Sequence, residues 1–316
     1  MLSDTATKPT PGAGQILVEN SHASINPSDY KVPGMGLGGR AMTTFPKTVG
    51  MDLVGIVREV GSGVSIVSLN DLVLVRLDPT KAAGSLSEFV VASKDQYALL
   101  ESHVNHASAA AAVTVGLTAY QTIKPYVKEG DKIFINEGSG GVGTASIQVA
   151  KLLGCHVTVS CSTPRVQMCQ SLGADKIIDY KTTDVVTALK KGGRRFSLVV
   201  DNVGTSPPNL HVPAQDFLLK DGVFVLLSVE TSFSGLRQAA IALFQPAIFG
   251  SARNKVVLYL TKNNHDDISQ LAQWLNEGKL NTIVDNVYNF GQVKDAFTRL
   301  KSGKAAGKFV VKVGDK

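Results

Sequence analysis

The chain has 316 residues, of which 44% are hydrophobic and 18% charged, and its formal net charge is +6. This length suits two domains of roughly 150 residues each, and the composition is that of a folded globular protein, not of a disordered or fibrous one. The basic residues are scattered, with neither a basic run nor zinc-finger spacing, so a mildly basic surface is favoured over nucleic-acid binding. No stretch approaches the ~18 apolar residues of a membrane span, and the N-terminus lacks a signal-peptide pattern. We therefore expect a cytoplasmic protein with no nucleic-acid or membrane partner.

Three cysteines, Cys155, Cys161 and Cys169, fall within one short region. An odd, clustered set suits neither a disulfide framework nor a four-ligand zinc site. We expect reduced thiols.

The first hundred or so residues predict a small barrel-like β domain, because short strand-like runs are separated by Gly and Pro. These runs are 15–20, 54–60, 71–77 and 86–93. The character changes at the Ala-rich stretch 106–123, where the apolar residues follow a helical period.

Beyond that helix, apolar strand-like runs alternate with helical stretches. The runs are 132–136, 156–160, 176–180, 196–201, 222–228 and 255–260. Six buried strands joined by crossovers predict a doubly wound parallel sheet. The tail predicts helices at 267–279 and 291–304, a strand near 284–290 and a last strand at 308–313.

The segment EGSGGVG, 137–143, follows one of these strands directly and opens a helix. A pyrophosphate needs an abrupt end to the strand and bare backbone N–H groups at the start of the helix. Glycine-rich turns also occur as plain packing devices, but a strand before the loop and a second strand after the helix favour dinucleotide binding. Glu137 is an exception within this pattern, because its carboxylate would repel a pyrophosphate unless it is turned away or neutralised.

The segment after the second strand of the sheet indicates which dinucleotide is bound. An NAD enzyme places Asp or Glu here for the ribose 2′-hydroxyl, whereas this chain has CSTPR. Ser162 and Thr163 offer hydroxyls, Arg165 offers a guanidinium suited to phosphate, and we expect no carboxylate to stand near this position and repel a 2′-phosphate. NADPH is therefore favoured over NADH, although Arg165 as a solvated residue opening the next helix stays an alternative.

Landmarks of one family occur in order along nearly the whole chain. They are INPSDYK (25–31), FPKTVGMDLVGIVREVGSGV (45–64), GSLSEFVV (84–91), GLTAYQTI (116–123), GDKIFINEGSGGVGTASIQVAK (130–151), SLGADKIIDYK (171–181), DNVG (201–204) and GKFVVKV (307–313). With these residues the chain resembles the zinc-independent branch of the medium-chain dehydrogenase/reductase superfamily, which contains quinone oxidoreductases and enoyl reductases.

The resemblance implies an α/β fold in which a doubly wound Rossmann domain is inserted in a GroES-like β-barrel catalytic domain. The expected ranges are 1–103 for the first part of the catalytic domain, 104–261 for the NADPH-binding domain and 262–316 for the second catalytic part. The usual first strand of the family has no counterpart, so we expect this edge of the catalytic domain to be missing or rebuilt. The resemblance also implies a homodimer, and NADPH in the cleft between the domains.

The cofactor contacts are likewise implied by the resemblance. The residues expected to face the pyrophosphate are Ser139, Gly140, Gly141, Val142 and Gly143. Those expected to face the 2′-phosphate are Ser162, Thr163 and Arg165, and Tyr180 is expected at the adenosine end. Those expected near the nicotinamide are Asn202, Val203, Ser228 and Val229.

Zinc-dependent members of the superfamily place Cys in the first landmark and His in the second. Here Ser28 and Met51 occupy the places that correspond to these zinc ligands, and the cysteines of a structural zinc lobe are absent. Without soft or imidazole ligands, we expect no metal site and no zinc-alkoxide chemistry. Hydride transfer to a conjugated C=C bond or to a quinone is still possible without zinc, because the developing oxyanion needs only hydrogen bonds and a proton.

Tyr30 is the candidate oxyanion donor or proton source, with Lys31 beside it and with Asn26 and Asp29 positioning ribose or substrate. An ordinary role for Tyr30 in the pocket wall, with solvent as the acid, is equally open. Asp52 is expected to be a buried structural acceptor.

His103 and His106 are expected to be surface or capping residues. The apolar stretch 230–254 is expected to line the pocket or contact a dimer partner. The expected pocket walls are Tyr30, Met51, Phe233, Phe244 and Phe249.

The sequence thus predicts a zinc-independent, NADPH-dependent reductase of α,β-unsaturated carbonyls or quinones, acting on a small apolar or aromatic substrate. One alternative is a pathway-specific enoyl reductase of secondary, polyketide-like metabolism. Another is an NADPH-binding regulatory protein without turnover.

Overall fold

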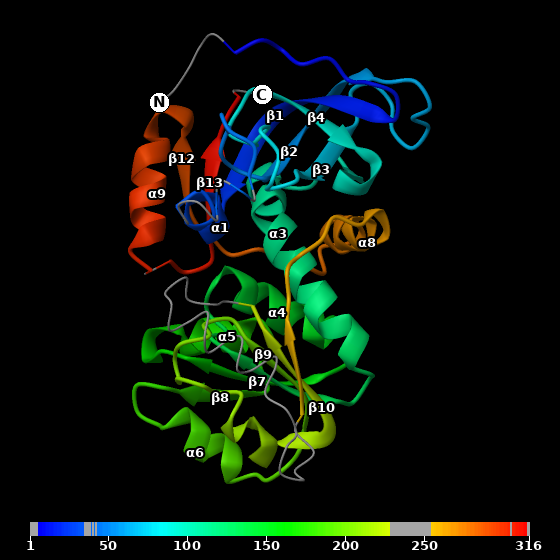
Figure 1. Cartoon of the computed structure of the whole chain (residues 1–316). Helices are drawn as coiled ribbons and strands as arrows, with labels where there is room; N and C mark the ends of the chain where they lie inside the picture. Colours follow the sequence, from blue (N-terminus) through cyan, green and yellow to red (C-terminus); the bar gives the residue numbers. More distant parts are fainter. Residues whose placement is uncertain are drawn as a thin grey trace. The chain divides into compact units, whose positions relative to one another are not determined.

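The computed structural model describes residues 6–34, 39, 41, 43–227, 254–303 and 305–314. The chain divides into two compact units, Met1–Leu117 with Lys262–Lys316, and Thr118–Thr261 (Figure 1). The first division falls inside helix α3 (His106–Ile123) and not between residues 103 and 104. A single long helix therefore leads from one unit into the other.

The first unit is built on a seven-stranded, mostly antiparallel sheet. Its strands run in the order β12-β13-β1-β2-β3-β5, and β4 also pairs with β1. The strands are β1 (Gln15–Ile25), β2 (Asp52–Val60), β3 (Leu72–Arg76), β4 (Phe89–Ser93), β5 (Tyr97–Leu100), β12 (Val284–Asn289) and β13 (Lys308–Lys312). Ile25 at the end of β1 lies opposite Phe309 of β13, so the start and the end of the chain meet in one sheet.

Alternating apolar residues on β1 to β4 form the core of this sheet. Ile16, Leu53, Val73 and Val90 are at most 2% exposed and belong to one cluster. Burying side chains of this size stabilises a fold by about 1.5–3 kcal/mol each. The predicted barrel-like β domain is therefore confirmed, although β5 was not predicted as a strand.

The helices of this unit are α1 (Pro27–Lys31), the first part of α3, α8 (His265–Asn276) and α9 (Val293–Lys301). Helix α8 begins where the Asn264 side chain accepts the Asp267 N–H at 3.0 Å, and it buries Ile268 and Leu271. A Cβ at Gly116 of α3 would overlap Leu271, so glycine lets the two helices approach. Helix α9 lies along β12 and β13 (Figure 1) and buries Ala296.

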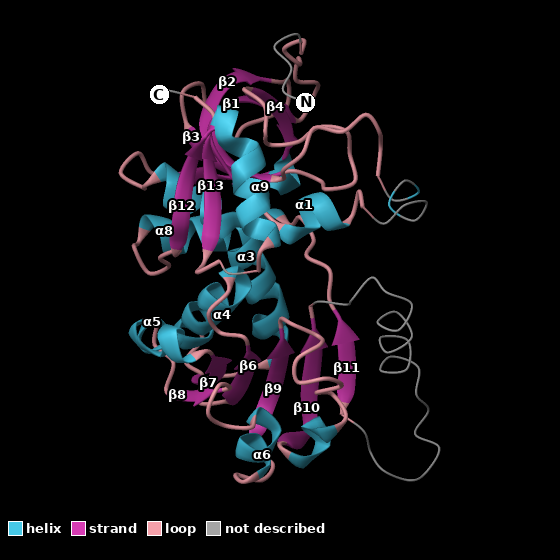
Figure 2. Cartoon of the chain, turned by 90° about the vertical axis from the view of Figure 1, so that its left-hand side faces the viewer, coloured by secondary structure: helices cyan, strands magenta, loops and turns pink. Residues whose placement is uncertain are grey.

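The second unit contains a six-stranded parallel sheet in the order β11-β10-β9-β6-β7-β8 (Figure 2). The strands are β6 (Lys132–Asn136), β7 (His156–Cys161), β8 (Lys176–Asp179), β9 (Phe196–Asp201), β10 (Leu218–Leu226) and β11 (Lys255–Leu258). The chain enters at the central strand β6, builds outward through β7 and β8, and then returns to build β9, β10 and β11 on the other side. This confirms the doubly wound sheet, whose topological switch point lies between β6 and β9.

Helices and short 3-10 turns connect these strands. They are α4 (Gly141–Leu152), α5 (Val166–Ser171) and α6 (Val185–Lys190), with η2 (Lys124–Tyr126), η3 (Thr163–Arg165) and η4 (Pro213–Asp216); the first unit adds η1 (Lys94–Gln96) and η5 (Phe290–Gln292). Phe134, Phe196, Phe217 and Phe224 are buried together in the core of this unit. Within the described part of the chain, no helix is long and apolar enough to cross a membrane.

Candidate cofactor and active site

Several segments predicted to bind the cofactor lie at one edge of the parallel sheet, where β6, β7, β8 and β9 end. The pairing sets Asn136 opposite Asp201, and Cys161 opposite Asp179, so these strands end close to the same level. Ligands of doubly wound sheets bind at this edge, next to the switch point. The fold therefore brings the glycine loop, the segment 162–165, Tyr180 and the segment 202–203 to the same side of the sheet.

The glycine loop packs tightly against itself and against the neighbouring strand β7. Gly140 is the N-cap of α4, and the first N–H groups of a helix have no partner within it. A Cβ at Gly143 would overlap the carbonyl oxygen of Glu137, and one at Gly138 would lie 2.9 Å from the Cβ of Val159. Glycine at these positions lets helix and loop pack closely and leaves backbone donors available for an anion.

Glu137 turns its side chain into this loop. Its Oε1 accepts the Ser139 hydroxyl at 2.7 Å, and its Oε2 accepts the Gly140 N–H at 3.0 Å. Burial raises the pKa of Glu137. The hydrogen bonds from these donors lower the pKa, but the effect of burial is larger. The carboxylate is thus not turned away from the predicted pyrophosphate position.

Asn136 and Asp201 fix the turn that follows β9. The Asn136 amide donates to Asp201 Oδ1 at 2.9 Å, and the same oxygen accepts the N–H of Val203 at 3.0 Å. Asn202 then donates from Nδ2 to the carbonyl of Glu137 at 3.2 Å. Among the described residues, the buried Asn202 Oδ1 has no hydrogen-bond partner.

A buried acceptor left unpaired costs about 1–3 kcal/mol. Asn202 Oδ1 therefore fits a site in which a bound molecule supplies the missing N–H or O–H, and a nicotinamide cofactor carries such donors. Together with the glycine loop, this orphaned oxygen shows that the residues present suit a dinucleotide.

The segment after β7 brings a positively charged side chain and also an unexpected carboxylate. Ser162 is the N-cap of η3, and Arg165 is half-buried close enough to Glu137 to lower the pKa of its carboxyl. Thr163, however, is hydrogen-bonded to Asp179 of β8, and this bond holds the pKa of that carboxyl below its ordinary value. The expectation that no carboxylate stands near this position is wrong, because parallel pairing brings the end of β8 beside the end of β7.

Tyr180, predicted to face the adenosine, directly follows β8. The residue is 46% exposed, and the Nζ atom of Lys181 lies 5.5 Å from the ring centroid. Its exposed face remains available for stacking. Ser228, Val229, Phe233, Phe244 and Phe249 lie outside the described residues.

In the first unit, the predicted catalytic segment forms the short helix α1. Asp29 is 6% exposed, and its Oδ2 accepts the backbone N–H of Asn26 at 2.7 Å. Burial raises the pKa of Asp29 to about 7, with a smaller contribution from the negative charge of Asp52. The start of α1 is therefore held by a carboxyl that changes charge near neutral pH.

A buried ion pair lies beneath the segment that carries α1. Asp52 is fully buried, and its Oδ2 accepts the Asn26 amide at 2.8 Å and lies 3.7 Å from the Nζ atom of Lys308. Lys308, 5% exposed, also donates to the Ile25 carbonyl at 3.0 Å and to Asn26 Oδ1 at 2.5 Å. The Thr114 hydroxyl donates to Asp52 Oδ1. Asp52 is thus confirmed as a structural acceptor, whereas the sequence reasoning missed Lys308.

The other predicted residues of this unit differ in exposure. The Tyr30 ring is half-buried and has the Nζ atom of Lys301 at 5.3 Å from its centroid, which is within reach of a cation–π contact. Lys31 is exposed, Ser28 is half-buried, and Met51 is only 2% exposed. The structure thus places Tyr30 half-buried with the Lys301 ammonium over its ring, and Met51 within the core.

No group of three His, Cys, Asp or Glu side chains in the described ranges is arranged to hold a metal ion. The donors at the ligand-like places, a Ser hydroxyl and a Met thioether, do not suit zinc. His103 lies at the surface, with Nε2 3.1 Å from the Asn276 carbonyl, and His106 begins α3 with Nδ1 3.0 Å from the Ser21 hydroxyl. His103 thus has the surface role expected for it, whereas His106 is half-buried and bonded to β1, so the surface or capping role expected for it is not found.

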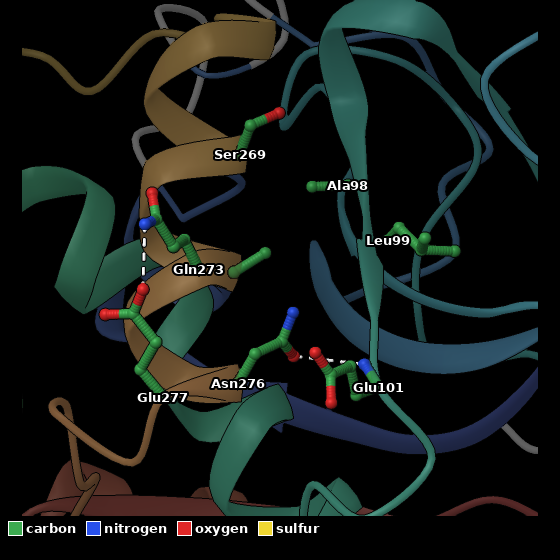
Figure 3. A pocket seen from close by; sticks show the side chains of 8 residues that line it. Ala98, Leu99, Glu101, Ser269, Gln273, Asn276 and Glu277 are labelled. Atoms are coloured by element: carbon green, nitrogen blue, oxygen red, sulfur yellow. Dashed lines mark hydrogen bonds between the residues drawn. The ribbon is translucent and has the colours of Figure 1, made fainter.

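A shallow pocket of about 310 Å³ lies between β5 and α8 (Figure 3). Hydrogen bonds from Gln273 to Glu277, and from the Glu101 N–H to Asn276, mark its walls. None of the predicted site residues lines it.

A GroES-like sheet unit and a doubly wound parallel sheet next to a glycine loop define the fold of the alcohol-dehydrogenase class. The family pattern described as "Alcohol dehydrogenase GroES-like domain" matches residues 12–102, and that described as "Zinc-binding dehydrogenase" matches residues 172–311. The solved structure of a quinone oxidoreductase from Coxiella burnetii superposes with a TM-score of 0.82 at 27% identity, covering 98% of this chain and 93% of that one.

Two curated relatives are similar along almost the whole chain. The trans-enoyl reductase pgmF of Aspergillus terreus is 38% identical over 315 residues, covering 96% of this chain and 88% of the relative. The human mitochondrial NAD(P)H oxidoreductase RTN4IP1 is 31% identical over 334 residues, covering 95% and 82%. The chain belongs to the medium-chain dehydrogenase/reductase superfamily, in its branch of quinone oxidoreductases and enoyl reductases. It is an NAD(P)H-dependent oxidoreductase of that type.

Proposed function

We propose that the chain is a zinc-independent reductase that uses NADPH to reduce the conjugated C=C bond of an α,β-unsaturated carbonyl compound, or a quinone. The glycine loop at the switch point, with the orphaned Asn202 Oδ1 beside it, is the observation that carries the cofactor half of this proposal. The relatives named as a trans-enoyl reductase and a quinone oxidoreductase support the substrate half.

Arg165 supports the choice of NADPH over NADH. A half-buried guanidinium next to the ribose end of the site suits a 2′-phosphate, which it can bind by charge-assisted hydrogen bonds. Asp179 acts in the opposite direction, because its carboxylate, bonded to Thr163, would repel a dianion or accept a ribose hydroxyl. We infer that the guanidinium outweighs this exposed carboxylate, whose charge solvent and Lys181 screen.

When bound, the cofactor supplies a hydride, and the protein must stabilise the negative charge that develops on the substrate oxygen. We propose that the Tyr30 hydroxyl donates a hydrogen bond to that oxygen. Helix α1 holds this tyrosine in place because Asp29 and Lys308 fix Asn26 at its start. Lys31 and the Lys301 ammonium over the ring add positive charge that favours an anion at this phenol.

Several observations support chemistry without zinc. The ligand-like places hold Ser28 and Met51, and Met51 is buried in the core. Asn26 is already bonded to Asp52 and Lys308. These residues therefore support a reaction that does not use the zinc named in the matching family description.

A stopped-flow screen tests the proposed function. The full chain is mixed with NADPH or NADH and with enones, quinones or enoyl thioesters, with and without a zinc chelator. We expect NADPH oxidation that is insensitive to chelator, and we expect Tyr30→Phe to lower kcat at least tenfold with little change in cofactor affinity, since a positioned proton donor contributes about 10²–10⁴-fold. A preference for NADH would contradict the phosphate site, and loss of activity in chelator would contradict the zinc-free mechanism.

The identity to a trans-enoyl reductase favours a second, narrower candidate, an enoyl reductase of secondary, polyketide-like metabolism. It predicts turnover of enoyl thioesters but not of simple enones or quinones in the same screen. NADPH binding without any turnover would instead favour the regulatory role. We further propose a homodimer and a cytoplasmic location, which sedimentation velocity and cell fractionation would measure.

A further inference from the structure

A carboxylate of the chain itself occupies donors of the glycine loop. Glu137 accepts the Gly140 N–H at 3.0 Å and the Ser139 hydroxyl at 2.7 Å. Both donors lie at the N-terminus of α4, where the helix dipole favours an anion. The chain thus already holds a carboxyl group where the pyrophosphate of a dinucleotide is proposed to bind.

The backbone of Glu137 aims its side chain into the loop. Its φ is 66°, in the left-handed region that a residue with a Cβ rarely adopts. Its N–H donates to the Ser160 hydroxyl at 2.9 Å, and its carbonyl accepts the Asn202 amide at 3.2 Å. A Cβ at Gly140 would overlap the carboxylate, so glycine there leaves room for it. Bonds on both sides of the residue therefore support this placement.

The surroundings of the carboxyl only partly neutralise it. Arg165 is the positive group that acts on it, and the thiols of Cys161 and Cys169 lie close by on β7 and α5. Burial raises the pKa of Glu137, whereas its two loop donors and Arg165 lower it. The group is thus a weaker acid than in water, and an approaching phosphate would weaken it further.

We propose that Glu137 is an internal anion that competes with the cofactor pyrophosphate for the Gly140 N–H and the Ser139 hydroxyl. Binding then requires the carboxylate to leave these donors or to take up a proton. The inference rests on the proposed cofactor site, and it makes Glu137 the residue that sets the affinity of the loop. Because only the ionised form competes and repels, affinity for the dinucleotide falls as pH rises.

Equilibrium binding of NADPH and NADH to the purified full chain, without substrate, tests this competition. Glu137→Gln removes the charge, and Glu137→Gly removes the side chain at a φ that glycine tolerates. Glu129→Gln is the matched control, because it removes the same charge from an exposed residue of the same unit. We expect both Glu137 variants to bind dinucleotide about tenfold more tightly than the wild type, and Glu129→Gln to leave the dissociation constant unchanged.

The pH dependence gives a second readout. The 2′-phosphate of NADPH itself ionises near pH 6, but this affects wild type and Glu137→Gln alike. The ratio of their dissociation constants should therefore increase with pH, over the range in which the wild-type carboxyl, whose pKa burial raises, loses its proton. A constant ratio close to one would overturn the competition.

The outcomes separate the two proposals. Unchanged or weaker binding by Glu137→Gln and Glu137→Gly would overturn the inference and leave the cofactor proposal intact. Failure of wild type and variants alike to bind either dinucleotide would overturn both. Circular dichroism and the melting temperature of each variant show whether the loop substitution leaves the chain folded.

Discussion

Replacing Lys308 by Met tests the buried ion pair beneath α1. The ammonium is 5% exposed, and the carboxylate of Asp52, 3.7 Å away, is fully buried. Removing one member of such a pair typically costs about 3–5 kcal/mol, because a buried charge is left without its partner. Asp52 keeps neutral donors from Ser24, Asn26 and Thr114, so we expect a loss of about 3 kcal/mol in the free energy of unfolding.

The chain offers a convenient probe for this measurement. Trp274 is the only tryptophan, it is 9% exposed, and it lies on α8 in the same unit as Lys308. Its fluorescence during urea unfolding therefore reports on the unit that contains the ion pair. Lys294→Met is the matched control, because Lys294 is exposed on α9, and substitutions of exposed residues usually change stability by less than about 0.5 kcal/mol.

A double variant distinguishes the ion pair from simple packing. In Asp52→Asn with Lys308→Met the charge that Lys308→Met leaves unpaired at position 52 is removed, so the double variant should be more stable than Lys308→Met alone. The reasoning would be refuted if Lys308→Met cost no more than Lys294→Met. It would also be refuted if the Asp52→Asn substitution destabilised the Lys308→Met protein further.

Three further predictions follow from charge and burial. Because burial raises the pKa of Asp29 to about 7, the folded chain keeps a proton that the unfolded chain releases near pH 4. Stability in urea should therefore fall as pH rises from about 4 to about 7, and Asp29→Asn should flatten this slope; an equal slope in both proteins would contradict the assignment. Arg165→Ala should raise the dissociation constant of NADPH about tenfold or more and leave that of NADH nearly unchanged, since a charged hydrogen bond contributes about 1.5–3 kcal/mol. Cys155, whose pKa burial raises to about 11, and the buried Cys161 and Cys169 should react with a disulfide reagent only after unfolding, and rapid reaction of any of them in the native chain would contradict their burial.

The parallel sheet could be predicted because its strands are short apolar runs, and the hydrophobic pattern alone identifies such runs. The predicted bounds of 132–136 and 196–201 coincide with β6 and β9. Strand β10 begins earlier than expected, at Leu218, because pairing of Leu218 with Phe196 extends it past a register shift. Strand β5 was missed because its four residues carry too little pattern to stand out.

The site was harder to predict, because its decisive contacts join residues that are distant in sequence. Lys308 reaches Ile25 and Asn26 from the opposite end of the chain, and only the pairing of β13 with β1 brings them together. Asp179 reaches Thr163 through the parallel register of β7 and β8, which a reading of CSTPR alone does not show. The sequence placed Glu137 in the loop but not the direction of its side chain, which the left-handed backbone determines.

The ion pair also bears on the proposed zinc-free mechanism. Two carboxyl groups, Asp29 and Asp52, lie buried close enough for the charge of Asp52 to help raise the pKa of Asp29. Such a cluster needs a positive charge, and the Lys308 ammonium supplies one from within the chain. A divalent cation bound here would have to displace this ammonium from Asn26 Oδ1 and from its place beside Asp52. Because two carboxyls, with no imidazole or thiolate beside them among the described residues, are too few ligands for zinc, we expect the wild type to bind no zinc in equilibrium dialysis, and stoichiometric zinc binding would contradict this argument.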